Sequence, residues 1–334
     1  MKKLEILDCT LRDGGYINNW TFGKKNINKI INNLTKANID YIECGFLSNV
    51  EYSHEKSIFN NPNQILEYVQ KSFPTNKLTL MINCGNFPIE KFPNCDNKNI
   101  LIRIAFKQED SKNALLYCKQ LKNKGYDIFI NPMHTNFYSS EELLELIKTV
   151  NSISPYAFTI VDTTGAMEEK DVLTIFRTID SNLDKNIKIC FHSHNNLQLS
   201  FSNAQAIIKE NSLRDLIIDS TVFGMGRGAG NIQTEQLVKY FNDNYSKDYK
   251  LLPILELIDE SINPIYKKTP WGYSVPYYLA ATNHCHPNYA KFLSDKKINV
   301  EKIDSILKEI PTEKKLAFDE IYIKSCYENL LITP

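Results

Sequence analysis

The chain has 334 residues, 43% of them hydrophobic and 23% charged, a composition typical of a globular protein and a length sufficient for an α/β barrel. Its 39 basic and 39 acidic residues balance, so no overall positive field favours nucleic acid as a partner. No stretch approaches the apolar length of a membrane span, and the N-terminal MKKLEILD lacks the apolar core of a secretory signal, so no membrane association is expected.

Cysteine usage indicates a reducing environment. The chain has eight cysteines and none forms a C-x-x-C pair, so neither a zinc ribbon nor a thioredoxin-like redox site is expected. Several of them lie inside apolar runs, where a free cysteine behaves as a small core residue. We therefore expect a cytoplasmic protein with reduced thiols.

Strand-like and helix-like stretches alternate along most of the chain. Short β-rich runs occur, in chain order, at 4–10, 40–46, 77–83, 100–106, 126–132, 157–164, 187–193 and 216–224. Helix-period stretches lie between them at 27–38, 113–125, 140–152 and 197–210, whereas 85–97 carries only a weak helical signal.

This alternation favours an α/β fold of the (β/α)8 TIM-barrel type. Apolar strands separated by helices are typical of parallel sheets covered on both faces, and eight units in about 240 residues match the size of a barrel. The alternative, a doubly wound open sheet, usually has fewer strands, and no G-x-G-x-x-G motif follows the first strand. The strand signal ends near residue 245, and 251–262 and the segment after Val275 have helical patterns. We predict a catalytic barrel over 1–245 and a helical C-terminal extension over 246–334.

Unusual polar residues gather at the ends of the predicted strands, where TIM barrels carry out their chemistry. They are Arg12, Asp13, Glu43, Arg103, Asn131, His134, Asp162, Thr163, Thr164 and the run 192–196. The last strand leads into the glycine-rich segment GMGRGAGN at 224–231. This concentration predicts a functional site at the mouth of the barrel.

His192 and His194 form the strongest single motif. Residues i and i+2 of a strand point to the same face, so both imidazoles can reach one cation. An isolated H-x-H pair is more often two hydrogen-bonded histidines, but this pair ends a strand, and a carboxylate, Asp13, follows the end of another. Two imidazoles and a carboxylate suit Mn²⁺, Mg²⁺, Zn²⁺ or Fe²⁺. We therefore predict a divalent metal site.

Two further histidine motifs are weaker. His284 and His286 form a second H-x-H, but their segment is predicted to be helical, and helical residues i and i+2 diverge by about 200°. They could not then face one ion, so we interpret them as structural. His54 follows the second strand and is either a surface loop residue or a binding residue.

The glycine-rich segment at 224–231 has two interpretations. It lacks the lysine of a Walker loop, and its glycines permit either a tight turn or close approach of the backbone to a ligand. It is either a turn before the last barrel helix or a substrate loop, in which Arg227 meets an anion and Asn231 reaches the metal or the substrate.

Five motifs in this order resemble those of the metal-dependent aldolase and Claisen-condensing barrels, the DRE-TIM metallolyases. The motifs are DCTLRDG (8–14), YIECGF (41–46), VDTTGA (161–166), FHSHNN (191–196) and GMGRGAGNIQTE (224–235). GAGN followed by IQTE, and IRIA at 102–105, are most similar to the 4-hydroxy-2-oxovalerate aldolase branch. The synthases usually carry an acidic residue where Gly226 stands.

The resemblance implies roles for individual residues. Asp13, His192 and His194 would bind the metal, Mn²⁺ or Mg²⁺ with Zn²⁺ as an alternative, and Asn231 would be a ligand or lie beside the ligands. Arg12 would stabilise an enolate, and Glu43 would lie near the metal. The residues expected to bind substrate are Arg103, Asp162, Thr164, Arg227 and Gly228.

Tyr16 departs from the family pattern. The aldolases place a catalytic histidine shortly after the Arg-Asp pair, and this chain has a tyrosine there. A tyrosine can donate a hydrogen bond or relay a proton, but its ordinary pKa of about 10 makes it a poor base at neutral pH. A metal-bound water, His134 or Glu43 would then be the base, or the acceptor differs. A further tyrosine of the family corresponds to Tyr273, Tyr277 or Tyr278.

The resemblance implies an aldolase that makes or cleaves a 4-hydroxy-2-oxo acid through pyruvate enolate, acting on a small 2-oxo acid and an aldehyde. No lysine stands out as a Schiff-base nucleophile, which agrees with a metal route. One alternative is an acyl-coenzyme A Claisen synthase or lyase. Another is an assembly subunit that docks an aldehyde dehydrogenase through the C-terminal extension, or a homo-oligomer.

Overall fold

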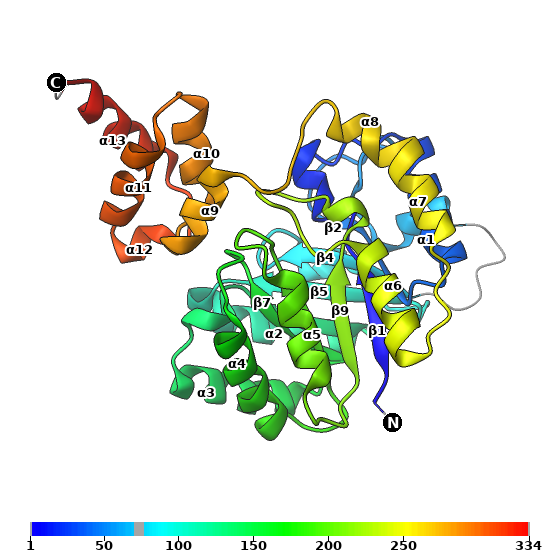
Figure 1. The fold of residues 1–334 in the computed structure, drawn as a ribbon. Coiled ribbons are helices and arrows are strands. Elements are labelled where there is room, and N and C mark those ends of the chain that lie inside the picture. The colour runs from blue at the N-terminus through cyan, green and yellow to red at the C-terminus, as the bar shows by residue number, and fades with distance from the viewer. Residues whose placement is uncertain (1, 70–76, 333–334) are drawn as a thin grey trace.

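The computed structural model describes residues 2–69 and 77–332. Within them, eight parallel strands form a closed barrel, because the first strand pairs with both the second and the last. They are β1 (Leu4–Asp8), β2 (Tyr41–Leu47), β4 (Lys77–Asn83), β5 (Ile100–Phe106), β6 (Asp127–Pro132), β7 (Ala157–Asp162), β8 (Lys188–Ser193) and β9 (Leu216–Ser220) (Figure 1). The prediction of a TIM barrel is confirmed, and each predicted β-rich run overlaps one of these strands.

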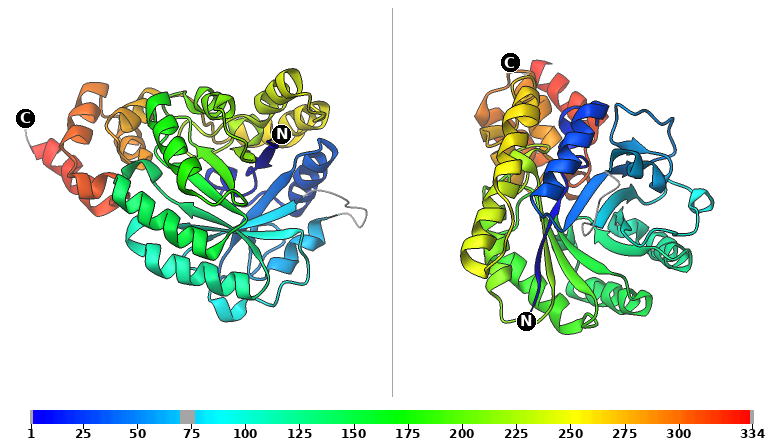
Figure 2. Two further views of the ribbon diagram at one scale, coloured as in Figure 1. Left: turned by 90° about the horizontal axis from the view of Figure 1, so that it is seen from below. Right: turned by 90° about the vertical axis from the view of Figure 1, so that its right-hand side faces the viewer.

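Helices surround the strands on the outside (Figure 2). The α-helices of the ring are α1 (Lys24–Lys36), α2 (Ser111–Asn123), α3 (Ser140–Ile153), α4 (Glu169–Asn182), α5 (Ser200–Lys209) and α6 (Thr234–Tyr245). The weak signal at 85–97 corresponds to a 3-10 helix, η3 (Ile89–Lys91). Between β2 and β4, the described residues form the short strand β3 (Ile58–Phe59) and the 3-10 helix η2 (Pro62–Tyr68).

Local sequence explains where these helices begin. At the start of α3, the Ser139 hydroxyl accepts a hydrogen bond from the Glu142 amide at 3.2 Å, and the Glu142 carboxylate accepts one from the Ser139 amide at 2.7 Å. This capping box satisfies two amides that the helix leaves free. The buried face of α3, with Leu143, Leu146 and Ile147, then packs against the barrel.

The inside of the barrel is divided into an apolar lower part and a charged upper part. Tyr41, Leu101 and Phe129 belong to a buried cluster that fills the lower part. Above it lie Arg103, Glu43 and Asp219, all charged and at most 2% exposed. Buried charges are stable only when they are paired, so this upper layer is built for a purpose other than packing.

The C-terminal helices fall into two groups. Helix α7 (Leu252–Leu257), a π-helical turn (Ile258–Ile262) and α8 (Asn263–Tyr266) extend the barrel core through Ile254, Leu257 and Ile262. A separate bundle with its own apolar core follows, consisting of α9 (Val275–Thr282), α10 (Pro287–Asp295), α11 (Val300–Glu309), α12 (Thr312–Lys315) and α13 (Glu320–Ile332). The bundle lies beside the end of the barrel to which the strands point (Figure 1). None of the described helices is long and apolar enough to cross a membrane.

The prediction that His284 and His286 lie within a helix is wrong. They occupy the turn between α9 and α10, with His284 in the left-handed region at φ 53°. Pro287 disfavours helical backbone at the residue before it, and the His286 Nδ1 instead accepts the Asn288 amide at 3.2 Å as the cap of α10. The two rings face different neighbours, His284 against Phe137 and His286 against Phe318.

Candidate active site

Three potential metal ligands converge at the upper end of the barrel. Oδ2 of Asp13 lies 3.2 Å from Nε2 of His192 and 3.3 Å from Nε2 of His194, and all three side chains are buried. Neighbouring ligands of a six-coordinate ion with bonds of about 2.1 Å are about 3 Å apart, so these spacings fit a divalent cation.

Hydrogen bonds to the other ring nitrogens determine what these histidines present to Asp13. Nδ1 of His192 lies 3.0 Å from the Asp219 carboxylate, and Nδ1 of His194 lies 3.4 Å from the Asp162 carbonyl. Both are acceptors, so each neutral imidazole carries its proton on Nδ1 and directs the lone pair of Nε2 at the Asp13 carboxylate. Three lone pairs that face one another repel unless a cation, or a proton, lies between them. The donor set therefore fits a divalent ion.

A proton and a metal ion would compete for His192. Burial lowers the pKa of His192, but the carboxylates of Asp13 and Asp219 outweigh it and raise the pKa. For Asp13, burial acts to raise the pKa, whereas Arg12 and His194 hold it well below the ordinary value. Asp13 is thus a permanent carboxylate, the form that binds metal.

Asp219 belongs to this cluster of buried charges and was not predicted from the sequence. It lies on β9, where its carboxylate accepts a hydrogen bond from Arg103 at 2.5 Å as well as facing His192. Burial acts to raise the Asp219 pKa, but Arg103 and His192 lower it to about 2. The signal was the acid in the apolar strand LIIDS, because a charge buried there needs a partner.

The end of β1 is shaped to present Asp13 to the histidines. The Asp8 carboxylate accepts the Thr10 amide at 2.9 Å, and the Asp13 amide bonds to the Cys9 carbonyl at 2.8 Å, which turns the chain. Gly15 then passes so close to Trp20 that a Cβ atom there would lie 2.1 Å from the indole. The indole nitrogen of Trp20 donates to the Arg12 carbonyl at 2.8 Å and fixes the turn.

Asn231 lies next to His194, with which it forms a β-bridge. Its Nδ2 donates to the Met225 carbonyl at 3.2 Å, whereas its Oδ1 is buried without a protein partner. Gly226 leaves room for this amide, since a Cβ atom there would be 2.3 Å from Nδ2. An unpartnered amide oxygen is available to a metal, a water or a substrate, and the predicted role of Asn231 stays a prediction.

Arg12 and Glu43 continue the charged layer on the other side of Asp13. Nε of Arg12 donates to the Glu43 carboxylate at 2.7 Å, and Glu43 also faces Arg103 at 3.2 Å. Burial opposes the charge on Arg12, but Glu43 and Asp13 raise its pKa well above the ordinary value. Arg12 is therefore held as a fixed positive charge beside Asp13.

A small pocket of about 70 Å³ opens onto the three ligands. That volume equals about five water positions, which is enough for a small organic acid. Six of the predicted site residues line it: Arg12, Asp13, Tyr16, His192, His194 and Arg227. The remaining lining is mostly apolar or amide side chains, including Phe46, Met81, Asn83 and Asn131.

Other predicted residues lie behind the pocket wall and do not line it. Glu43 and Arg103 are in the charged layer below. The Asp162 carboxylate accepts the amides of Ala166 and Met167 at 3.0 and 3.1 Å, and it thereby shapes the turn after β7. The Thr164 carbonyl accepts the Asn196 amide, whose oxygen in turn accepts the Ala229 amide of the glycine-rich loop. These contacts indicate positioning of the loops.

Tyr16 and Arg227 stand at the mouth of the pocket. The Arg227 guanidinium lies 4.9 Å from the centre of the Tyr16 ring, which also packs edge-on against Trp20 and Phe46. Burial raises the pKa of Tyr16 despite the opposing charge of Arg227. Its hydroxyl therefore stays protonated at neutral pH and can donate a hydrogen bond.

His134 and Gly228 line neighbouring cavities. His134 adopts a left-handed conformation at φ 55°, and its amide donates to the Thr163 hydroxyl at 2.8 Å. Its ring lies beyond Met133 in an adjoining cavity of about 140 Å³, and burial lowers its pKa to about 4. Gly228 faces the cavity between the barrel and the bundle, and its predicted substrate contact remains untested.

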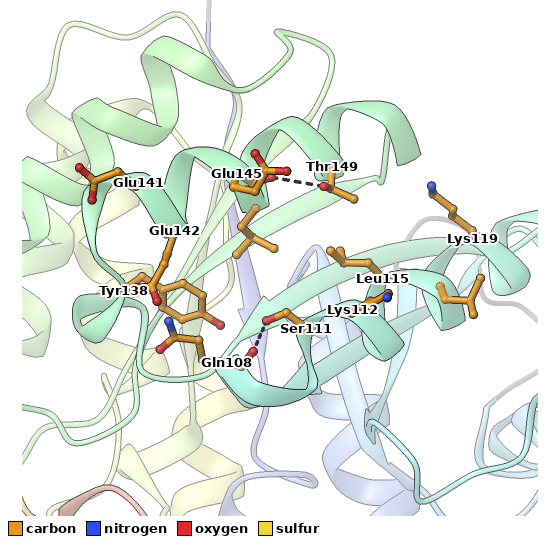
Figure 3. A pocket seen from close by; sticks show the side chains of 12 residues that line it. Gln108, Ser111, Lys112, Leu115, Lys119, Tyr138, Glu141, Glu142, Glu145 and Thr149 are labelled. Carbon is orange, nitrogen blue, oxygen red and sulfur yellow. Dashed lines mark hydrogen bonds between the residues drawn. The ribbon is translucent and has the colours of Figure 1, made fainter. Parts of the chain in front are cut away.

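A larger groove lies on the outer wall of the barrel, between α2 and α3 (Figure 3). Its volume is about 670 Å³, and its lysines and glutamates, among them Lys112, Lys119 and Glu145, are exposed. None of the predicted site residues lines it. The chemistry therefore belongs at the barrel mouth, despite the greater size of the outer groove.

Comparison with known proteins identifies the family. The HMGL-like family model matches residues 3–257. The 4-hydroxy-2-oxovalerate aldolase of Bacillus cereus is 25% identical over 269 residues, which are 79% of this chain and 77% of that protein.

Two solved structures have the same fold. The N-terminal domain of a candidate aldolase from Bacteroides vulgatus is 26% identical, with a TM-score of 0.70 over 91% of this chain and 97% of that chain. The HMG-CoA lyase of Brucella melitensis is 14% identical, with a TM-score of 0.59 over 77% of this chain and 96% of that chain. Because the family model matches residues 3–257, which contain all eight barrel strands and more than half of the chain, the chain belongs to the HMGL-like family.

Proposed function

We propose that this protein is a divalent-metal-dependent aldolase that makes or cleaves a 4-hydroxy-2-oxo acid through the enolate of pyruvate. The observation that carries the proposal is the convergence of Asp13, His192 and His194 at 3.2–3.3 Å on the floor of a pocket sized for a small organic acid. The family match and the aldolase relatives support the same chemistry.

Asp13, His192 and His194 would hold the ion, with the Asn231 oxygen available as a further ligand. Mn²⁺ and Mg²⁺ are the expected ions, because carboxylate and amide oxygens accompany the two imidazoles. When bound, such an ion polarises the carbonyl of a 2-oxo acid and lowers the energy of the enolate.

Arg12 would supply the second positive charge at the oxygen of the enolate. Its guanidinium lines the pocket and is held by Glu43, so no reorganisation is needed when charge develops on the substrate. Cleavage of the bond between carbons 3 and 4 of the substrate would leave an electron pair on the carbon beside the ketone. The positive charge of Arg12 stabilises the resulting enolate. The same arrangement serves the reverse addition.

Tyr16 would act on the aldehyde half of the substrate. It lines both the pocket and the adjoining cavity, and its protonated hydroxyl can donate a hydrogen bond to the aldehyde oxygen as that oxygen becomes negative. Glu43 is engaged by two arginines and lies outside the pocket, and His134 lies in the adjoining cavity with its pKa lowered to about 4. A water would then be the base that accepts the substrate proton.

Exchange of the pyruvate methyl protons for deuterium, followed by NMR, tests the proposal. Enolisation should occur in the metal-loaded protein, stop with EDTA and return with Mn²⁺ or Mg²⁺. Turnover of a 4-hydroxy-2-oxo acid to pyruvate and an aldehyde should follow the same pattern. Exchange that persists fully after chelation, or turnover of acyl-coenzyme A substrates alone, would contradict it.

A further inference from the structure

A second cavity begins where the catalytic pocket ends. Its volume is about 840 Å³, and it lies between the mouth of the barrel and the C-terminal bundle. Tyr16 and Arg227 line both spaces and form their junction. A molecule whose reacting carbonyl lies in the small pocket would therefore extend past Tyr16 into this larger cavity.

Hydrogen bonds within the chain hold the wall of this cavity in place. The Gly272 amide donates to the Gly228 carbonyl at 3.3 Å, so the linker between α8 and α9 is tied to the glycine-rich loop. Trp271, 8% exposed, donates through its indole nitrogen to the Phe223 carbonyl at 3.0 Å. These bonds hold the linker against the barrel and fix the cavity beside the site.

The charges of this cavity do not balance. Its two carboxylates are already paired, Asp295 with Lys291 at 2.8 Å and Glu320 with Lys324 at 2.6 Å. Arg227 and Lys268, which also line it, have no carboxylate partner among residues 2–69 and 77–332. Two uncompensated positive charges in one cavity favour an anionic ligand.

The size of the cavity points in the same direction. A neutral aldehyde of two or three carbons would occupy little of the cavity of about 840 Å³. A longer acceptor would fill the space, contact the aromatic walls formed by Tyr277 and Phe292, and bring its far end to Lys268.

We propose that the acceptor aldehyde is an extended molecule with an anionic group, a phosphate or a carboxylate, distant from its carbonyl, which Arg227 and Lys268 bind in this cavity. The inference rests on the proposed aldolase function and names its second substrate. It assigns the C-terminal bundle a part in substrate recognition, since the bundle forms one wall of the acceptor cavity.

The test compares acceptors in the aldol addition catalysed by the full-length, metal-loaded protein. Pyruvate is offered with glyceraldehyde 3-phosphate, succinic semialdehyde and butanal, which represent phosphate, carboxylate and neutral acceptors. We expect kcat/KM for at least one anionic aldehyde to exceed that for butanal by about tenfold or more. The anionic aldehyde with the larger kcat/KM shows whether the cavity prefers a phosphate or a carboxylate. Equal values for all three acceptors would overturn the inference.

Substitution of Lys268 localises the effect. Lys268→Gln should reduce the preference for the anionic aldehyde, and Lys268→Arg should restore it. Lys267→Gln is the matched control, because Lys267 is an exposed neighbour that does not line the cavity. If Lys268→Gln lowers kcat/KM equally for the anionic aldehyde and for butanal, or leaves the preference unchanged, the inference is overturned.

Deuterium exchange by the wild-type protein distinguishes failure of the acceptor inference from failure of the proposed aldolase function. If pyruvate exchanges but no anionic aldehyde is preferred, the acceptor inference fails and the aldolase function stands. If pyruvate does not exchange in the metal-loaded protein, the aldolase function fails and the acceptor inference fails with it.

Discussion

His192 lies between two carboxylates, with Nδ1 facing Asp219 and Nε2 facing Asp13. Its substitution should therefore remove a ligand without disturbing the apolar core. We expect His192→Ala to lose stoichiometric metal, measured by elemental analysis after gel filtration, while its circular dichroism remains that of the wild type. His54→Ala, at an exposed position, is the control. Full retention of metal by His192→Ala would refute the ligand role.

Asp219 should influence the metal without touching it. Asn cannot match the charge of Arg103 and accepts the His192 proton more weakly, so the imidazole loses basicity and orientation. We expect Asp219→Asn to weaken metal binding about 10- to 100-fold in a chelator-competition assay. Asp243→Asn on the exposed face of α6 should bind metal as the wild type does. Wild-type affinity in Asp219→Asn would contradict this role.

Tyr16 should affect the aldehyde half of the reaction more than the pyruvate half. Removing one hydrogen-bond donor from a developing oxyanion typically costs about 10²–10³ in rate. We expect Tyr16→Phe to slow aldol addition by a factor of this order and to slow deuterium exchange much less. Tyr240→Phe, at a tyrosine of α6 that lines neither the pocket nor the adjoining cavity, is the comparison. Equal losses in both assays would assign Tyr16 to enolisation instead.

Residue by residue, the sequence revealed which side chains gather at the mouth but not their depth. His192 and His194 could be placed on one face because strand alternation requires it. Arg103 was expected to contact substrate, but it does not line the pocket. On β5 it pairs with Phe129, a residue of the apolar cluster below, and its guanidinium lies 5.4 Å from that ring. Depth depends on how the strands are staggered around the barrel, and single-strand patterns carry no such information.

At the scale of the elements, Asp8 at the end of β1 contacts the first residue of α6 and has an unusual pKa. The Asp8 carboxylate accepts the Thr234 hydroxyl at 2.6 Å, and burial raises its pKa to about 6 despite this bond. A carboxyl whose folded pKa exceeds its unfolded value favours the folded state most at low pH. This contribution is present below about pH 4 and is lost as the pH rises to about 6.

We therefore expect Asp8→Asn to change the pH dependence of stability. The free energy of unfolding of the wild type, relative to the variant, should fall by roughly 2–3 kcal/mol between pH 4 and pH 7. Urea titrations at both pH values measure this difference. Asp184→Asn, at an exposed acid, provides the control. A constant difference between wild type and Asp8→Asn would show that Asp8 titrates normally.

The strands were the predictable elements, and the turns were not. Each barrel strand is a short apolar run between breakers, so its pattern identified it directly. The turn at 284–286 was mistaken for helix because it lies inside the segment after Val275, which was predicted to be helical and does form helices on both sides of the turn. The helix is interrupted there by the left-handed backbone of His284 and by the cap that His286 forms on α10. Neither feature can be recognised from the spacing of apolar residues.

At the scale of the whole molecule, the metal should stabilise the fold. The Asp13, His192 and His194 atoms repel one another when no cation or proton separates them. We expect EDTA to lower Tm by roughly 4 °C, because an ion at a hundred times its Kd adds about 2.7 kcal/mol. Scanning fluorimetry with Mn²⁺ titrated back measures it. His192→Ala should respond little to either reagent, and a shift as large as that of the wild type would contradict the assignment.

The layer of charge inside the barrel also sets an electroneutrality condition for its ligands. Arg12 and Arg103 are matched against Asp13, Glu43 and Asp219, so with neutral histidines the layer has one negative charge in excess. A divalent ion reverses that excess to one positive charge, and a monoanionic 2-oxo acid then cancels it. Dianions and neutral ketones would each leave a charge unbalanced where water is scarce. In the proposed reaction, the charge of this layer alone would favour a monoanionic first substrate.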